Sequence, residues 1–154
     1  MQIKTIRQLI RWVFPLAIAA YGAAAQAEDE VTLFNARGAA EAYIAIDDGL
    51  TIYLWSGKPV AYLEKAGTDE GYNVYGFNGK HLGWFAKGAI YAHDGTAACA
   101  TAQVMTSATQ LEPLKSLKEL APLQSLTELS PLQPVLASRF GDTPCRFLLG
   151  AGSK

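Results

Sequence analysis

The chain has 154 residues, of which 13 are Lys or Arg and 14 are Asp or Glu, and half of all residues are hydrophobic. This near-neutral balance has no block of basic residues, which argues against nucleic acid or anionic lipid as the main electrostatic partner. The length fits a single domain with a modest core.

Residues 1–27 are predicted to be an export signal. They have a basic start, an apolar run over residues 12–25, and small residues at Ala25 and Ala27. Small residues three and one before the cut suit a signal peptidase, so we expect a signal helix that is cleaved after Ala27 and a periplasmic or secreted protein. The alternative is an uncleaved membrane anchor, although Pro15 interrupts the run and a spanning helix needs roughly 20 apolar residues.

A twelve-residue pattern then occurs four times. The copies are LFNARGAAEAYI (33–44), IYLWSGKPVAYL (52–63), VYGFNGKHLGWF (74–85) and IYAHDGTAACAT (90–101). They share an aromatic second residue, the turn glycines Gly38, Gly57, Gly79 and Gly95, and the small residues Ala42, Ala61, Gly83 and Cys99. Three agreeing columns indicate an internal repeat.

Each copy predicts a β-hairpin. Asn78-Gly79 and Asp94-Gly95 are typical of two-residue type I′ turns, and β-branched and aromatic residues flank them. Alternation along the strands then divides the third copy into two faces. One face has Tyr75, Phe77, Leu82 and Trp84, and the other has Val74, Gly76, His81, Gly83 and Phe85.

We expect the hairpins to form an all-β domain over residues 28–104, a pseudo-fourfold rosette or shallow barrel. A single hairpin is marginal in water, so the four must share a core. Small side chains suit the place where backbones crowd, which puts Ala42, Ala61, Gly83 and Cys99 near a common axis. Closure of the array also removes unpaired sheet edges.

Residues 105–138 contain a Pro-Leu repeat. Leucine recurs every third residue from Leu111 to Leu132, and Pro113, Pro122 and Pro131 recur every ninth. Period three keeps leucine on one stripe in polyproline II geometry but smears it around an α-helix. We therefore expect an extended ribbon with its leucines pressed on the domain; short helical turns starting at each proline, a disordered stalk and a docking strip for a partner are the alternatives.

The repeat unit, best seen in IYLWSGKPVAYL, its fourfold recurrence and the following Pro-Leu run resemble the four-fold β-flower domain. The resemblance covers roughly residues 31–138. It implies a small pseudo-symmetric all-β rosette and points to no particular activity. The first copy departs from the pattern at Glu41, and the fourth departs from it at Ala100 and Thr101.

The chain has two cysteines, Cys99 and Cys145. In an oxidising compartment they can form a disulfide that pins the C-terminal tail, residues 139–154, to the rosette. Alternatively, Cys99 is only a small buried side chain in the column that otherwise holds alanine and glycine.

No catalytic set is recognisable. His81 and His93 are the only histidines, and each has a structural reading beside a strand and a functional reading as general base or ligand. A metal site needs three or four ligands, so we expect no metal and no cofactor. A periplasmic hydrolase is the weakest hypothesis, and it requires His93 to lie beside a carboxylate in a cleft.

Aromatic residues are the richest remaining feature, as core or as a ligand site. The candidates for binding a sugar face or an acyl chain are Tyr53, Trp55, Tyr75, Phe77, Trp84, Tyr91 and His93. We therefore expect a non-enzymatic, exported binding or scaffolding module of the cell envelope, whose partner is an envelope component or a small apolar or sugar ligand. The alternative is a membrane-associated module that binds lipid or acyl chains.

Overall fold

The computed structural model of the protein describes residues 29–67 and 71–154. The predicted export signal lies outside the described residues, so its helix and its cleavage after Ala27 stay predictions. Within the described ranges, no helix is both long enough and apolar enough to cross a membrane.

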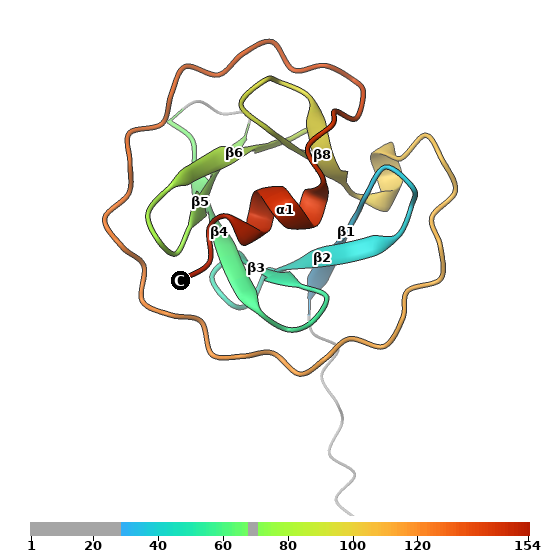
Figure 1. Ribbon diagram of the computed structural model, residues 1–154, viewed down its shortest axis with the longest axis horizontal. Coiled ribbons are helices and arrows are strands. Elements are labelled where there is room, and N and C mark those ends of the chain that lie inside the picture. The colour runs from blue at the N-terminus through green and yellow to red at the C-terminus, as the bar shows by residue number, and fades with distance from the viewer. Residues whose placement is uncertain (1–28, 68–70) are drawn as a thin grey trace, which may run out of the picture.

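Eight antiparallel strands close into a barrel in chain order (Figure 1). They are β1 (Glu30–Phe34), β2 (Ala40–Ala45), β3 (Thr51–Leu54), β4 (Pro59–Lys65), β5 (Tyr72–Gly76), β6 (His81–Ala86), β7 (Ala89–Tyr91) and β8 (Ala97–Ala100). The barrel closes where Phe34 of β1 pairs with Ala100 of β8. Two short helices follow, the 3₁₀ turn η1 (Ala102–Val104) and the α-helix α1 (Cys145–Gly150). The all-β fold of four hairpins is confirmed.

The predicted type I′ turns are wrong. Gly57 donates its N–H to the carbonyl of Leu54 at 2.8 Å, and Leu54 donates to Lys58 at 2.9 Å, which makes a three-residue loop. The other three hairpins repeat this pair of bonds. Only the glycine of each loop has a positive φ, between 76° and 87°. The structure is thus the three-residue hairpin that ends in a left-handed glycine and a bulge.

Asn and Asp still matter in these turns, through their side chains. Asn78 accepts a hydrogen bond from the N–H of Lys80 at 3.1 Å, and Asp94 accepts one from the N–H of Thr96 at 2.9 Å. A side chain that bonds the backbone two residues on stabilises a tight turn. These hydrogen bonds from Thr96 also lower the pKa of Asp94.

The extra loop residue changes which side chains share a face. The pairing register shifts at the same place in all four hairpins, for example between Val74 and Tyr75. As a result Leu82 lies with Val74 inside the barrel, whereas His81 joins Tyr75 and Trp84 outside. The predicted grouping of Leu82 with the aromatic residues is therefore wrong, because it assumed a hairpin without a bulge.

The barrel interior holds an aliphatic core, and the small-residue column contributes to it. Ala42, Ala61 and Cys99 are fully buried in this core. The C-terminal helix α1 lies across the barrel mouth in Figure 1 and adds Cys145 and Leu149 to the same cluster. The structure joins Cys99 to Cys145 by a disulfide. Small side chains thus leave room for a helix that closes the barrel end.

Candidate functional site: a leucine belt on the barrel

Residues 108–137, here called the belt, run around the outside of the barrel. Figure 1 shows this segment encircling the strands before the chain returns to α1 over the mouth. The belt has neither helix nor strand, so the helical turns considered from its prolines do not occur. An extended course agrees with its period of three residues.

The belt is tied to the barrel through its backbone. Its N–H groups donate to the carbonyl oxygens of the turn glycines at 2.8–2.9 Å, and the bonds recur every nine residues. The donor and acceptor pairs are Gln110 with Gly38, Glu119 with Gly57, Glu128 with Gly79, and Ala137 with Gly95. One nonapeptide of the belt therefore corresponds to one hairpin of the barrel.

Glycine is required at these turns for a second reason besides its φ. A Cβ atom added at Gly79 would lie 2.1 Å from the carbonyl oxygen of Leu126, far inside the contact distance. The other three turn glycines meet the belt in the same way, at 1.9–2.5 Å from the carbonyl oxygens of Ala108, Leu117 and Val135. The four turn glycines of the repeat are thus the places where the belt backbone contacts the barrel.

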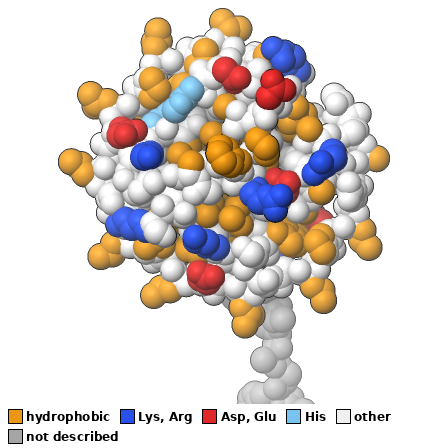
Figure 2. Space-filling view, viewed as in Figure 1, with side chains coloured by type: hydrophobic (Ala, Val, Ile, Leu, Met, Phe, Trp, Pro, Cys, Tyr) orange, Lys and Arg blue, Asp and Glu red, His pale blue; other side chains and the backbone are white. Residues whose placement is uncertain are grey.

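The leucines of the belt point away from the barrel, so the expectation that they press on the domain is wrong. The exposed fractions of Leu111, Leu114, Leu117, Leu120, Leu123, Leu126, Leu129 and Leu132 are 89–99%. Figure 2 shows hydrophobic side chains projecting around the outline of the molecule. Backbone bonds to the turns fix the rotation of the belt, and aromatic residues fill the space beneath it.

Two clusters of aromatic residues lie between the barrel wall and the belt. Tyr43 and Tyr53 stack with their ring centroids 5.5 Å apart, next to Trp55. The second cluster contains Tyr62, Tyr75 and Phe77. Trp55 donates from Nε1 to the carbonyl of Pro113 at 3.1 Å, and the Tyr75 hydroxyl donates to the carbonyl of Glu128 at 3.0 Å.

These contacts place four of the predicted ligand-binding aromatic residues under the belt, namely Tyr53, Trp55, Tyr75 and Phe77. Tyr53, Tyr75, Phe77, Trp84 and Tyr91 are only 2–7% exposed, while Trp55 is half-buried and His93 is exposed. Burial raises the pKa of both Tyr62 and Tyr75. In this structure these four rings support the belt, and ligand binding by the predicted aromatic residues stays a prediction.

Charged groups add a clamp where the chain enters the barrel. Glu30 at the start of β1 forms ion pairs with Lys115 and Lys118 of the belt. The Lys115 ammonium also lies 4.5 Å from the ring centroid of Tyr43, within the range of a cation–π contact. Tyr53 donates to Asp48; burial and then this hydrogen bond raise the pKa of Tyr53.

The buried His81, which contacts Ser130 of the belt, stacks with the exposed His93. Nδ1 of His81 lies 2.9 Å from Nε2 of His93, and Nε2 of His81 lies 3.2 Å from Oδ1 of Asn73 and 3.3 Å from the hydroxyl of Ser130. Burial, and secondarily the neighbouring His93, lowers the pKa of His81 to about 4, although Glu128 opposes this. His81 is thus a neutral hydrogen-bonding residue at pH 7. No group of three potential metal ligands occurs in residues 29–67 and 71–154.

Glu41, the departure in the first copy, has a structural role that the sequence did not reveal. Other copies have Val60, Leu82 or Ala98 at this bulge position, all buried in the barrel. Glu41 instead accepts a hydrogen bond from Asn35 at 2.6 Å and one from the N–H of Arg146 at 3.0 Å. It therefore ties the first turn of α1 to the first hairpin.

Fold and site together define a class: a closed barrel of four hairpins, clasped by an extended belt that binds each hairpin turn through its backbone. The chain matches the family model described as 4-fold beta flower protein over residues 31–149, which includes the barrel, the belt and most of α1. It belongs to the 4-fold β-flower family. None of the curated proteins and none of the solved structures compared with the chain matches it.

Proposed function

We propose that the protein is an exported, non-enzymatic binding or scaffolding module of the cell envelope, and that the leucine row of the belt is its contact surface. The observation that carries the proposal is the exposure of all eight leucines, at 89–99%. Burying a Leu side chain is worth about 1.5–3 kcal/mol at about 25 cal/mol per Å², or about 60–120 Å² each. Eight leucines then expose roughly 500–1,000 Å² of apolar area in total, spread as a ring around the barrel, whereas the largest contiguous patch of a typical monomer is about 300–600 Å².

The belt presents this surface on a fixed frame. Backbone hydrogen bonds to four turn glycines, aromatic donors to two belt carbonyls and the Glu30 ion pairs hold the segment in place. A held surface loses less conformational entropy on binding than a flexible segment does. Regular leucines on such a frame favour a contact function over a packing function.

The polar residues support a structural role better than a catalytic one. His81 is held neutral between His93, Asn73 and Ser130, while Glu30 and Glu41 bond to the belt and to α1. The disulfide supports the exported location, because such bonds persist mainly in oxidising compartments. Mass spectrometry of the mature N-terminus tests the export step; an intact residue 1 in envelope fractions would contradict cleavage after Ala27.

The contact surface is tested by replacing belt leucines while the barrel is left intact. Leu114, Leu117, Leu126 and Leu129 are changed together to serine, and Phe147→Ser, at an exposed apolar residue on α1, serves as the matched control. The parent protein and both variants are compared for sedimentation with purified envelope fragments. Loss of binding in the belt variant alone is the expected result; equal binding by all three proteins would overturn the assignment of the leucine row.

A membrane surface is the second candidate partner, and one observation favours it. Glu30 is held against the belt, so the chain enters the barrel beside the leucine row, only a few residues after the apolar run 12–25. A retained run would tether the belt to a bilayer, into which leucines can insert. Co-sedimentation with phosphatidylethanolamine–phosphatidylglycerol vesicles separates the two candidates, because a protein that stays in the supernatant does not bind lipid.

A further inference from the structure

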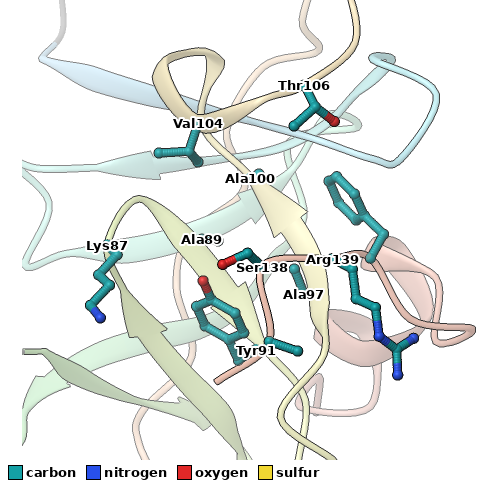
Figure 3. A pocket seen from close by; sticks show the side chains of 11 residues that line it. Lys87, Ala89, Tyr91, Ala97, Ala100, Val104, Thr106, Ser138 and Arg139 are labelled. Carbon is teal, nitrogen blue, oxygen red and sulfur yellow. The ribbon is translucent and has the colours of Figure 1, made fainter. Parts of the chain in front are cut away.

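A cavity of about 470 Å³ lies on the outside of the barrel at β7 and β8. Figure 3 shows its wall, formed by Ala89, Ala97 and Ala100 of the strands, with Val104 and Thr106 on one side and Ser138 and Arg139 on the other. Its second wall is the end of the belt and the residues after it, which reach the barrel where Phe140 pairs with Ala97. The cavity is therefore part of the space that separates barrel and belt.

The internal repeat explains why this space is open. The eleventh residue of each copy is Tyr43, Tyr62 and Trp84 in the first three hairpins, and these rings fill the space under the belt. In the fourth hairpin the same position is Ala100, which lines the cavity. The fourth residue is likewise aromatic in the second to fourth copies and alanine, Ala36, in the first. The ring of the eleventh position is thus absent at this cavity, whereas Ala36 does not line it.

The polar groups of the cavity define the charge of an occupant. Its lining includes two cationic side chains, Lys87 and Arg139, and no carboxylate. The hydroxyls of Tyr91, Ser138 and Thr106 are available as hydrogen-bond donors. The charge of Arg139 is one of the causes that lower the pKa of Asp94, so Arg139 already interacts with a carboxylate. Lys87 is therefore the cation that a bound anion would contact first.

We propose that this cavity binds a small amphipathic anion, with its apolar body against Ala89, Ala97, Ala100 and Phe140 and its carboxylate at Lys87. The volume of about 470 Å³ falls within the roughly 300–1,000 Å³ of small-molecule sites. A mainly apolar wall with a few polar groups at the rim is also typical of such sites. This site does not depend on the leucine row and is separate from the proposed contact surface.

The test uses decanoate as the probe and calorimetry on the purified protein. We expect one decanoate per chain, with decanol bound at least tenfold more weakly because it lacks the charge. Ala100→Tyr restores the ring present in the other copies and should abolish binding, whereas Ala151→Tyr, at an exposed residue after α1, should leave binding unchanged. A circular dichroism spectrum and a thermal melt check that both variants fold.

Lys87→Gln keeps the proposal testable even if Ala100→Tyr fails to fold, because Lys87 is exposed. We expect it to weaken decanoate binding about fivefold or more and to leave decanol binding unchanged. The fourfold belt variant with serine at 114, 117, 126 and 129 should bind decanoate normally. Binding that survives Ala100→Tyr, or that disappears in the belt variant, would show adsorption to the leucine row and overturn the proposal, as would the absence of any decanoate binding.

Discussion

The aromatic row of the hairpins and the leucine row of the belt are both apolar and both regular, yet one is buried and the other is exposed. The rings of Tyr53 and Tyr75 lie beneath the belt, and Leu117 and Leu126 lie above it, on the opposite side of the same extended segment. The rings stabilise the barrel-to-belt contact, whereas the leucines contribute nothing to it. Stability and recognition are thus separated onto two sides of one segment, and substitutions on the two sides should have different effects.

The largest effect is expected from removing the disulfide, which closes the loop that contains the whole belt. Cys99 and Cys145 are 46 residues apart, and the loop-closure model gives about 4 kcal/mol of stabilisation for a loop of that length. The double variant Cys99→Ala with Cys145→Ala should lose about this much unfolding free energy and therefore unfold at a lower urea concentration. Trypsin should also cut faster at Lys115 and Lys118. Unchanged unfolding and unchanged cutting would contradict the role of the disulfide in closing the belt.

Adding a Cβ atom at a turn glycine that contacts the belt is expected to have the next largest effect. In Gly79→Ala the new Cβ atom meets the carbonyl oxygen of Leu126, and residue 79 has a φ of 87°, which strains a side chain. The loss of unfolding free energy therefore combines overpacking with backbone strain and should total about 2–4 kcal/mol. Gly49→Ala is the matched control, because Gly49 also has a positive φ, 61°, but has open space at the Cβ position. Urea unfolding should show about 1 kcal/mol for the control. Equal losses of unfolding free energy in the two variants would mean that the belt moves away from the new Cβ atom at no measurable energetic cost.

Beneath the belt, His81 makes the barrel-to-belt contact sensitive to acid. Its pKa is lowered from 6.5 to about 4 in the folded protein, so between these values the unfolded chain takes up a proton that the folded protein does not. Stability from this group is complete above pH 6.5 and is lost as the pH falls toward 4. The unfolding free energy of His81→Gln should therefore change less than that of the parent between pH 7 and pH 4. Parallel pH profiles would contradict this.

A smaller effect is expected at a single hydrogen bond to the belt. Tyr75→Phe removes the donor to the carbonyl of Glu128 and should lower stability by about 1 kcal/mol. Tyr91→Phe is the comparison, since the Tyr91 hydroxyl borders the cavity instead of bonding a belt carbonyl. Thermal unfolding of the two variants should differ by several degrees; identical curves would mean that the Glu128 bond contributes nothing.

The smallest effect is expected on the outer side of the belt. Leu117→Ser should change the unfolding free energy by less than about 0.5 kcal/mol, because the side chain is almost fully exposed. A loss above 1 kcal/mol in urea unfolding would show that the leucine row packs on something in the isolated protein, and the contrast between the two rows would fail.

Several features of the fold could be predicted from sequence because they depend on local residues. The turn glycines, the alternation of the strands and the small-residue column indicated four hairpins and their closure. The faces of β6 were partly wrong, since a bulge after each loop moves Leu82 inside and His81 outside. Asn78-Gly79 is compatible with two turn types, and the choice between them depends on backbone pairing that no dipeptide specifies.

The orientation of the belt could not be read from its period. Spacing of three places the leucines on one side of the ribbon but leaves the rotation of the ribbon open. Backbone bonds from residues such as Glu119 and Glu128 to the turns determine that rotation. A signal existed nonetheless: the nine-residue recurrence of the belt and the recurrent turn glycines implied paired contacts. The packing of α1 into the barrel mouth through Cys145 and Leu149 gave no such signal. It depends on a contact between the C-terminal tail and strands that are distant in the sequence.

The correspondence of one nonapeptide to one hairpin also limits how this protein can change in length. Belt donors are spaced evenly at nine residues, while the turn glycines that receive them are 16 to 22 residues apart in the chain, at 38, 57, 79 and 95. We therefore expect insertions in the loops at the other end of the barrel to be tolerated, since they do not alter the distance in space between neighbouring turns. Gain or loss of a whole hairpin would instead require the gain or loss of one nonapeptide of the belt at the same time. We therefore expect relatives to keep four hairpins even where their loops vary in length.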